Sequence, residues 1–166
     1  MTSDVRRLIV MRHAKTEPTA STDRSRRLTD RGRADARAAG RMLAESGLTP
    51  TAALVSPAVR AQQTFEQVVD GFGAAVALTT YDELYGADEH EVVELCTRLA
   101  SPIHTALVIG HNPTMAGLVH ALQESPPQDW PDPLPTSGFA VLTIPGDWSE
   151  LELRSAAWET TQVPRG

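Results

Sequence analysis

"LIVMRHAKTEP", residues 8–18, joins four apolar residues directly to an arginine and a histidine. Leu8 to Met11 have the pattern of a strand that is apolar on both faces, which is typical of the middle of a parallel sheet covered by helices. Arg12 and His13 end this strand, and both would be costly to bury without partners. The stretch therefore predicts a buried strand at 8–12 whose end carries polar side chains for a chemical reason.

Strand-like and helix-like segments alternate along the rest of the chain. Thr29 is the expected N-cap of a helix that runs to about Ser46 and is stopped by Gly47. The other predicted helices are 57–72, 88–100 and 113–123, and the other predicted strands are 51–56, 74–79 and 104–110. Such alternation predicts one α/β domain over residues 1–166 with a mostly parallel sheet.

The C-terminal part follows a different pattern. The segments "GFAVLTIP" (138–145) and "ELELRSAAW" (150–158) predict a β-hairpin with its turn at "PGDWS" (145–149). Before them, residues 124–138 carry five prolines, at 126, 127, 131, 133 and 135. This proline-rich stretch predicts a surface loop.

The composition is that of an ordinary globular chain, with 166 residues, 41% hydrophobic and 22% charged. Its longest apolar runs are about strand length and "MTSDVRR" lacks the apolar region of a secretory signal, so we expect a cytoplasmic protein without a membrane contact. Cys96 is the single cysteine, which excludes an internal disulfide. Its helical surroundings predict an unreactive core thiol.

Charge is distributed unevenly along the chain. The net charge is −6, but residues 1–60 hold 12 Lys+Arg against 6 Asp+Glu, and residues 61–166 hold 3 against 15. An acidic protein is a poor candidate for binding nucleic acid without sequence preference. The local basic excess suits a small anion or a phosphorylated partner, although Arg33, Arg37 and Arg41, spaced four apart, are expected simply to solvate a helix face.

Two more predicted strands end in a polar residue followed by proline, in "VSPAVRAQQT" and "VIGHNPTM". We expect Ser56 and Asn112 to cap the next helices and Pro57 and Pro113 to take their first helical positions. Two helix N-termini would then lie at the carboxyl edge of the sheet, where α/β folds bind ligands. Their free N–H groups and partial positive charge favour an anion.

Four side chains are predicted to converge at this edge: Arg12, His13, Arg60 and His111. The planar fork of arginine suits phosphate oxygens. The sequence contains no serine-nucleophile elbow, Walker loop or glycine-rich dinucleotide turn, so histidine is the credible nucleophile. The histidines lack the spacing of a zinc hydrolase helix, and we expect neither a metal nor a cofactor.

Three motifs resemble the histidine phosphatase superfamily in order and spacing: "LIVMRHA", "LVSPAVRAQQT" and "LVIGHNP". The family pattern is a strand ending in Arg-His-Gly, then Ser-Pro-x-x-Arg-x-x-x-Thr, then Gly-His. The small size, "RRLTDRG" and "DELYGAD" are similar to the branch that contains the bacterial phosphohistidine phosphatase SixA. The resemblance covers roughly residues 8–122, with a weaker echo at "PTSGFAVL", and departs from the pattern at Ala14.

The resemblance implies a phosphoglycerate mutase-like, three-layer α/β/α sandwich and a metal-independent phosphatase. His13 would accept the phosphoryl group, Arg12 and Arg60 would clamp its oxygens, and His111 would donate to them. Two in-line transfers would pass phosphate first to His13 and then to water, with inorganic phosphate as product. The expected partner is a phosphorylated protein or a small phosphorylated metabolite, and the chain is expected to be a monomer.

The proton donor and the outer contacts stay open. Glu83 in "YDELYG" matches the region where some members carry a proton-donating glutamate, Asp82 competes with it, and a solvated acidic loop would need neither. Lys15 and Arg27 are candidates for contacts with the substrate beyond its phosphate. Further residues near the site without an assigned role are Arg24, Arg26, Gln63 and Thr64.

Three functions fit these residues. The first is a phosphohistidine phosphatase acting on a protein. The second keeps the chemistry but takes a small phosphomonoester. The third is a non-catalytic module that binds a phosphorylated ligand, although a binder would not need a nucleophilic histidine. Few residues between Arg60 and His111 are left for a cap, which favours an open site and a protein-borne phosphate.

Overall fold

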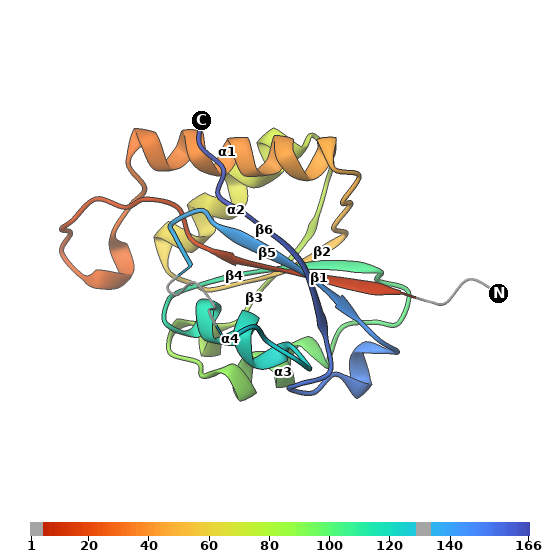
Figure 1. Cartoon of the computed structure of the whole chain (residues 1–166). Coiled ribbons are helices and arrows are strands. Elements are labelled where there is room, and N and C mark those ends of the chain that lie inside the picture. Colours follow the sequence, from red (N-terminus) through yellow and green to blue (C-terminus); the bar gives the residue numbers. More distant parts are fainter. Residues whose placement is uncertain (1–4, 129–133) are drawn as a thin grey trace.

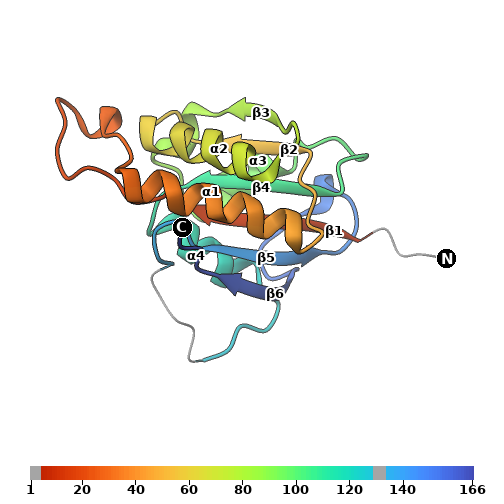
Figure 2. The same cartoon turned by 90° about the horizontal axis from the view of Figure 1, so that it is seen from above.

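The computed structural model describes residues 5–128 and 134–166, through which one six-stranded sheet runs. Figure 2 shows its strands in the order β3-β2-β4-β1-β5-β6. Their bounds are β1 (Arg6–Arg12), β2 (Ala52–Val55), β3 (Ala77–Thr80), β4 (Thr105–Gly110), β5 (Phe139–Ile144) and β6 (Ala157–Gln162). Neighbours among β1–β4 are parallel and β5 pairs antiparallel with β1 and β6, which confirms the mostly parallel sheet.

Helices cover both faces of the sheet, as Figure 1 shows. One face packs against α1 (Asp30–Glu45) and α2 (Val59–Phe72), and the other against α3 (Glu89–Cys96) and α4 (Thr114–Leu122). Thr29 caps α1 by accepting a hydrogen bond from the Gly32 N–H, as predicted. These layers confirm the three-layer α/β/α architecture.

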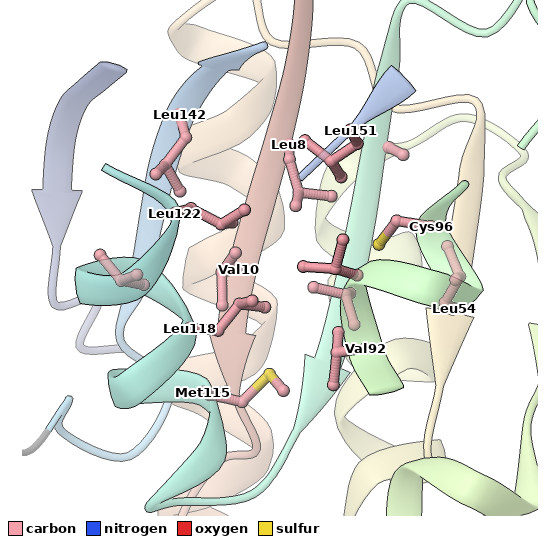
Figure 3. Packing of buried hydrophobic residues seen from close by; sticks show 14 of the residues in the cluster. Leu8, Val10, Leu54, Val92, Cys96, Met115, Leu118, Leu122, Leu142 and Leu151 are labelled. Carbon is pink, nitrogen blue, oxygen red and sulfur yellow. The ribbon is translucent and has the colours of Figure 1, made fainter. Parts of the chain in front are cut away.

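The side chains of β1 alternate between the two cores. Ile9 and Met11 belong to the cluster shared with α1 and α2, whereas Leu8 and Val10 belong to the cluster shared with α3 and α4. Figure 3 shows the second cluster, in which Leu8 and Val10 lie beside apolar residues of α4. All four are almost completely buried. The strand is therefore held on both faces, and its end has a fixed position.

The predicted starts of two helices were wrong by one or two residues. Ala58, not Ser56, precedes the first residue of α2, so Pro57 is not helical. Pro113 is itself the N-cap of α4, although the Asn112 Oδ1 still accepts a hydrogen bond from the Ala116 N–H. The Ser56 hydroxyl accepts a hydrogen bond from the N–H of Ala58, which is the N-cap itself, rather than from an N–H inside α2, and it also bonds a histidine, described below.

The predicted hairpin was also wrong in its second strand. β6 begins at Ala157 rather than at 150, and a short 3-10 helix, η3 (Trp148–Glu150), lies where the turn was expected. Trp148 is fully buried and its indole N–H donates to the Ile103 carbonyl. Burial of this large side chain draws the segment into the core, which a tight turn could not do.

Smaller differences concern the edges of the other elements. β3 begins three residues later than predicted and lies at an exposed edge of the sheet, and α3 ends at Cys96 rather than at 100. Cys96 is buried, and burial raises the pKa of its thiol to about 12, which agrees with an unreactive thiol. Within the described ranges, none of the helices has the length and apolar character needed to span a membrane. Pro131 and Pro133 of the predicted loop lie outside the described residues.

Candidate active site

The end of β1 is fixed by backbone hydrogen bonds to its neighbours. The His13 N–H donates to the Gly110 carbonyl of β4 at 3.1 Å, and the His13 carbonyl accepts from the Ser137 N–H at 3.1 Å. The next N–H, that of Ala14, donates to the Thr64 hydroxyl on α2 at 3.0 Å. His13 is thus held between β4, the turn that precedes β5, and α2, which gives its ring a defined place.

Ala14, where the wider family often has glycine, causes no strain. Its side chain is completely buried in the cluster beneath α1 and α2. The non-glycine residues with positive φ in the described chain are Ser137 and Arg154, so Ala14 has an ordinary backbone conformation. The backbone after His13 therefore does not need a conformation that only glycine can adopt, and alanine is accommodated at this position.

The tautomer of His13 follows from its hydrogen bond. Its Nδ1 lies 2.8 Å from the Ala14 carbonyl, and because a carbonyl only accepts, Nδ1 carries the proton. The lone pair is then on Nε2. Burial, His111, Arg60 and Arg12 lower the pKa of His13 to about 3, against the opposing hydrogen bond to Ala14. At neutral pH the ring is therefore uncharged and can act as a nucleophile through Nε2.

His111 follows β4 and is oriented by a serine. Its Nε2 lies 2.7 Å from the Ser56 hydroxyl, which also accepts a hydrogen bond from the Ala58 N–H at 3.3 Å. Because that bond uses the hydroxyl oxygen as an acceptor, the hydroxyl proton is free for His111 Nε2. This arrangement favours a proton on His111 Nδ1, which would be a donor for an oxyanion.

Two arginines surround the histidine pair. The rings of His13 and His111 are 5.3 Å apart, centroid to centroid. Burial lowers the pKa of His111 most and brings it to about 4, and the charges of Arg60, in the first turn of α2, and of Arg12 lower the pKa of both rings further. The four predicted residues are therefore brought together as a positively charged cluster.

Two buried polar atoms in this cluster lack a protein partner. They are His111 Nδ1 and Arg12 Nε, and neither has a hydrogen-bond partner among the described residues. A buried donor without a partner costs free energy, and functional sites are a common reason for one. Donors of this kind, with two guanidinium groups nearby, suit the oxygens of a phosphoryl group.

Ser56 gives a first testable prediction. Replacing it by alanine removes the hydroxyl that orients His111, so a fraction of the rings should carry the proton on Nε2 instead of Nδ1. We expect kcat/KM to fall about tenfold, the effect of roughly 1.4 kcal/mol. The ¹⁵N chemical shifts of His111 should report the change of tautomer. Ser46→Ala is the matched control, since the Ser46 hydroxyl donates to the Met42 carbonyl at the far end of α1. Equal effects from both variants would contradict the role of Ser56.

The other predicted residues are not joined to this cluster. Glu83 lies in the 3-10 helix η2 (Asp82–Tyr85), is exposed, and lines a surface hollow with acidic residues of α3. Within the described chain its carboxylate makes no hydrogen bond or ion pair with the four clustered residues. Asp82 is exposed and lies 3.5 Å from Arg24. Lys15 lines a separate cavity beside α1, and Arg27 is exposed.

The unassigned residues have structural contacts. Gln63 Oε1 accepts from the Leu28 N–H at 2.8 Å, which ties the loop after β1 to α2. Thr64 donates to the Arg60 carbonyl at 2.7 Å. Arg26 holds the same loop through the Glu17 carbonyl. These hydrogen bonds give the residues a structural role, which is to hold the loop after β1 and the start of α2 in place.

Sequence reasoning missed Asp23 and Tyr85. Asp23 starts the 3-10 helix η1 (Asp23–Ser25), and its carbonyl and carboxylate accept hydrogen bonds from the Arg60 guanidinium at 2.8 and 3.1 Å. The Tyr85 hydroxyl donates to the same carboxylate, and its ring stands edge-on to His111 with centroids 5.7 Å apart. The sequence did contain one indication of a role for Asp23, which is the single acidic residue in 18–29 and stands beside three arginines.

Comparisons with known proteins agree with this geometry. A family model of the histidine phosphatase superfamily (branch 1) matches residues 8–88. An uncharacterized protein of Mycobacterium leprae is 34% identical over 165 residues, which cover 93% of this chain and 100% of that protein. The chain belongs to the histidine phosphatase superfamily, in its SixA-like branch.

Solved structures point to the same branch. The structure of the phosphohistidine phosphatase SixA from Nakamurella multipartitia is 28% identical with a TM-score of 0.84, covering 96% of each chain. The protein histidine phosphatase SixA complexed with tungstate is 28% identical with a TM-score of 0.81, covering 95% of this chain and 97% of that one. Family and neighbours together support phosphatase activity on a phosphorylated substrate.

Proposed function

We propose that the protein is a metal-independent cytoplasmic phosphatase that acts through a phosphoryl group on His13 and removes phosphate from phosphohistidine on a protein. The observation that carries this proposal is the fixed tautomer of His13, whose Nδ1–H bonds the Ala14 carbonyl while Nε2 keeps its lone pair among cationic groups. The likeness to SixA proteins over nearly the whole chain supports the choice of phosphohistidine.

The reaction consists of two in-line transfers. His13 Nε2 attacks phosphorus, the bond from phosphorus to the leaving group breaks, and its electron pair departs with the leaving group. Water then attacks the phosphoryl group on His13, and the bond from phosphorus to Nε2 breaks with its electron pair returning to Nε2. One proton of the water is taken up by a phosphate oxygen as inorganic phosphate leaves. Arg12, Arg60 and the Nδ1–H of His111 would stabilise the negative charge of both transition states.

The segment between Arg60 and His111 supports a large substrate. It contributes the rest of α2, the edge strand β3, η2, α3 and the core strand β4, and none of these forms a separate cap domain. An accessible site suits a phosphohistidine that stands on a protein surface. A single-domain, monomeric enzyme without a cofactor is part of the same proposal.

A comparison of substrates tests the proposal. The full chain should be given a protein phosphorylated on histidine and a panel of small phosphate monoesters, with and without EDTA. We expect kcat/KM to be at least about tenfold higher on phosphohistidine and insensitive to EDTA, because protein cations supply the charge. A preference for an ester would favour the small-molecule phosphomonoesterase, and phosphate binding without turnover would favour the binding module.

Glu83→Gln separates the two catalytic alternatives further. A positioned general acid contributes roughly 10²- to 10⁴-fold when an alkoxide leaves, whereas imidazole leaves readily once it is protonated. Because the Glu83 carboxylate is exposed and makes no ion pair with the clustered residues, we expect less than about a threefold loss on phosphohistidine. Asp82→Asn is the matched comparison. A large loss on phosphohistidine with Glu83→Gln alone would make Glu83 a catalytic residue.

A further inference from the structure

Asp23 lies at the outer boundary of the site. The loop between β1 and α1, shown in red-orange in Figure 1, carries it past the carboxyl edge of the sheet. A capping box between Thr22 and Ser25 fixes η1, and the side chain of Asp23 is 54% exposed while that of Arg60 beside it is 9% exposed. The carboxylate is thus both rigidly held and open to solvent.

The carboxylate has room for one more donor. Its Oδ2 accepts from Arg60 and Tyr85, and its Oδ1 accepts from Arg26 at 3.2 Å. An ionised carboxylate offers about four acceptor positions, so one remains at Oδ1. The hydrogen bond from Tyr85, and those from Arg60 and Arg26, lower the pKa of Asp23 to about 2 although burial acts in the opposite direction. It is therefore charged at every pH used in an assay.

In-line attack by His13 places the leaving group on the side of the site where Asp23 lies. The side chain of His13 is inside the protein, with only 8% of the residue exposed. In-line displacement requires the leaving group to lie opposite the attacking nitrogen. A leaving group opposite a buried nucleophile must extend toward solvent, where Asp23 and Tyr85 border Arg60 and His111.

We propose that Asp23 determines specificity by accepting a hydrogen bond from the ring N–H of the phosphohistidine that His13 attacks. This inference rests on the proposed function. In the protonated substrate, one ring nitrogen carries the phosphoryl group and the other carries a proton. When the P–N bond breaks, its electron pair goes to the ring nitrogen, and the substrate leaves as neutral imidazole with that proton still in place. No proton has to move during the step.

The carboxylate acts by keeping the substrate ring protonated. An unprotonated ring would have to leave as an imidazolate anion, which is a much poorer leaving group. A neighbouring negative charge raises the pKa of an imidazolium ion. A phosphate ester has no corresponding N–H, so the same carboxylate gives an ester no such help.

The pH dependence of this effect is separate from the titration of the enzyme. The charged and titratable groups that face Asp23 are Arg60 from α2, Arg26 from its own loop and Tyr85 from η2, with Arg24 over the Tyr85 ring and His111 behind it. The hydrogen bond to Asp23 raises the pKa of Tyr85 above its ordinary 10, and the pKa values of His13 and His111 are about 3 and 4. Changes of kcat/KM between pH 6 and 9 therefore report the substrate ring.

Asp23→Asn tests the inference, because asparagine keeps the shape and an acceptor for Arg60. We expect kcat/KM on a phosphohistidine peptide to fall about tenfold at pH 8, the effect of about one pKa unit, and to fall only about twofold at pH 6, where the ring is protonated without help. On an aryl phosphate the loss should stay within about twofold at both pH values. Asp70→Asn is the control, since Asp70 pairs with Arg37 away from the site.

Each other outcome has a definite meaning. An equal loss on both substrates, independent of pH, would mean that Asp23 only positions Arg60 and would overturn the inference while leaving the proposed function intact. No loss on either substrate would overturn it as well. A wild-type protein that hydrolyses esters but not phosphohistidine would overturn both proposals.

Discussion

Replacing His13 by alanine should abolish turnover of every phosphorylated substrate and leave no phosphoryl group on the protein. The hydrogen bond from Nδ1 to the Ala14 carbonyl fixes the lone pair of His13 on Nε2, whereas the Nε2 of His111 is engaged by the Ser56 hydroxyl. We expect kcat/KM to fall by at least about 10⁴-fold, as when other covalent nucleophiles are removed. The substitution leaves a small cavity at the end of a strand, so we expect the variant to fold.

Trapping the intermediate makes this prediction sharper. Rapid quenching of the wild type in alkaline denaturant should preserve an acid-labile phosphoryl group, and peptide mapping should place it on His13. His90→Ala is the matched control, because His90 is exposed on α3 and should leave both turnover and trapping unchanged. Phosphate found on another residue, or an active His13→Ala variant, would refute the proposed mechanism.

The parts of the fold that could be predicted are those where pattern and burial coincide. Leu8 to Met11 are apolar at consecutive positions because both faces of β1 are covered, so the strand and its sheet type followed directly. The prediction of the hairpin turn was wrong because Trp148 is buried by contacts with residues distant in sequence, including the Ile103 carbonyl. Local turn residues do not reveal such an anchor.

The residues of the site likewise fall into those that the sequence pattern predicts and those that it does not. Arg12, His13, Arg60 and His111 lie at the ends of strands or at the start of a helix, and the parallel topology brings such positions to one edge. Asp23 and Tyr85 lie in short 3-10 segments whose positions depend on loop geometry rather than on a periodic pattern. Their 62-residue separation left their hydrogen bond invisible in the sequence.

Replacing Arg60 by alanine should lower kcat/KM by at least about a hundredfold, corresponding to about 3 kcal/mol of transition-state stabilisation. The Arg60 guanidinium is nearly buried, and it uses two different nitrogens to bind Asp23, which shows that its fork is held in one orientation. A phosphoryl group carrying developing negative charge would meet this preset donor. Steady-state kinetics on phosphohistidine and on an aryl phosphate should show the loss with both substrates.

Two comparisons separate the role of Arg60 from loss of charge or of stability. Arg37→Ala removes an arginine of α1 that binds Asp70 and Gln67 on α2, so it tests the general effect of losing a surface arginine and should change kcat/KM less than about twofold. Arg60→Lys keeps the positive charge but not the planar fork, so its kcat/KM should fall between those of the wild type and Arg60→Ala. Thermal unfolding of each variant shows whether it is folded. Small and equal effects of Arg60→Ala and Arg37→Ala in folded proteins would mean that Arg60 does not contact the phosphoryl group.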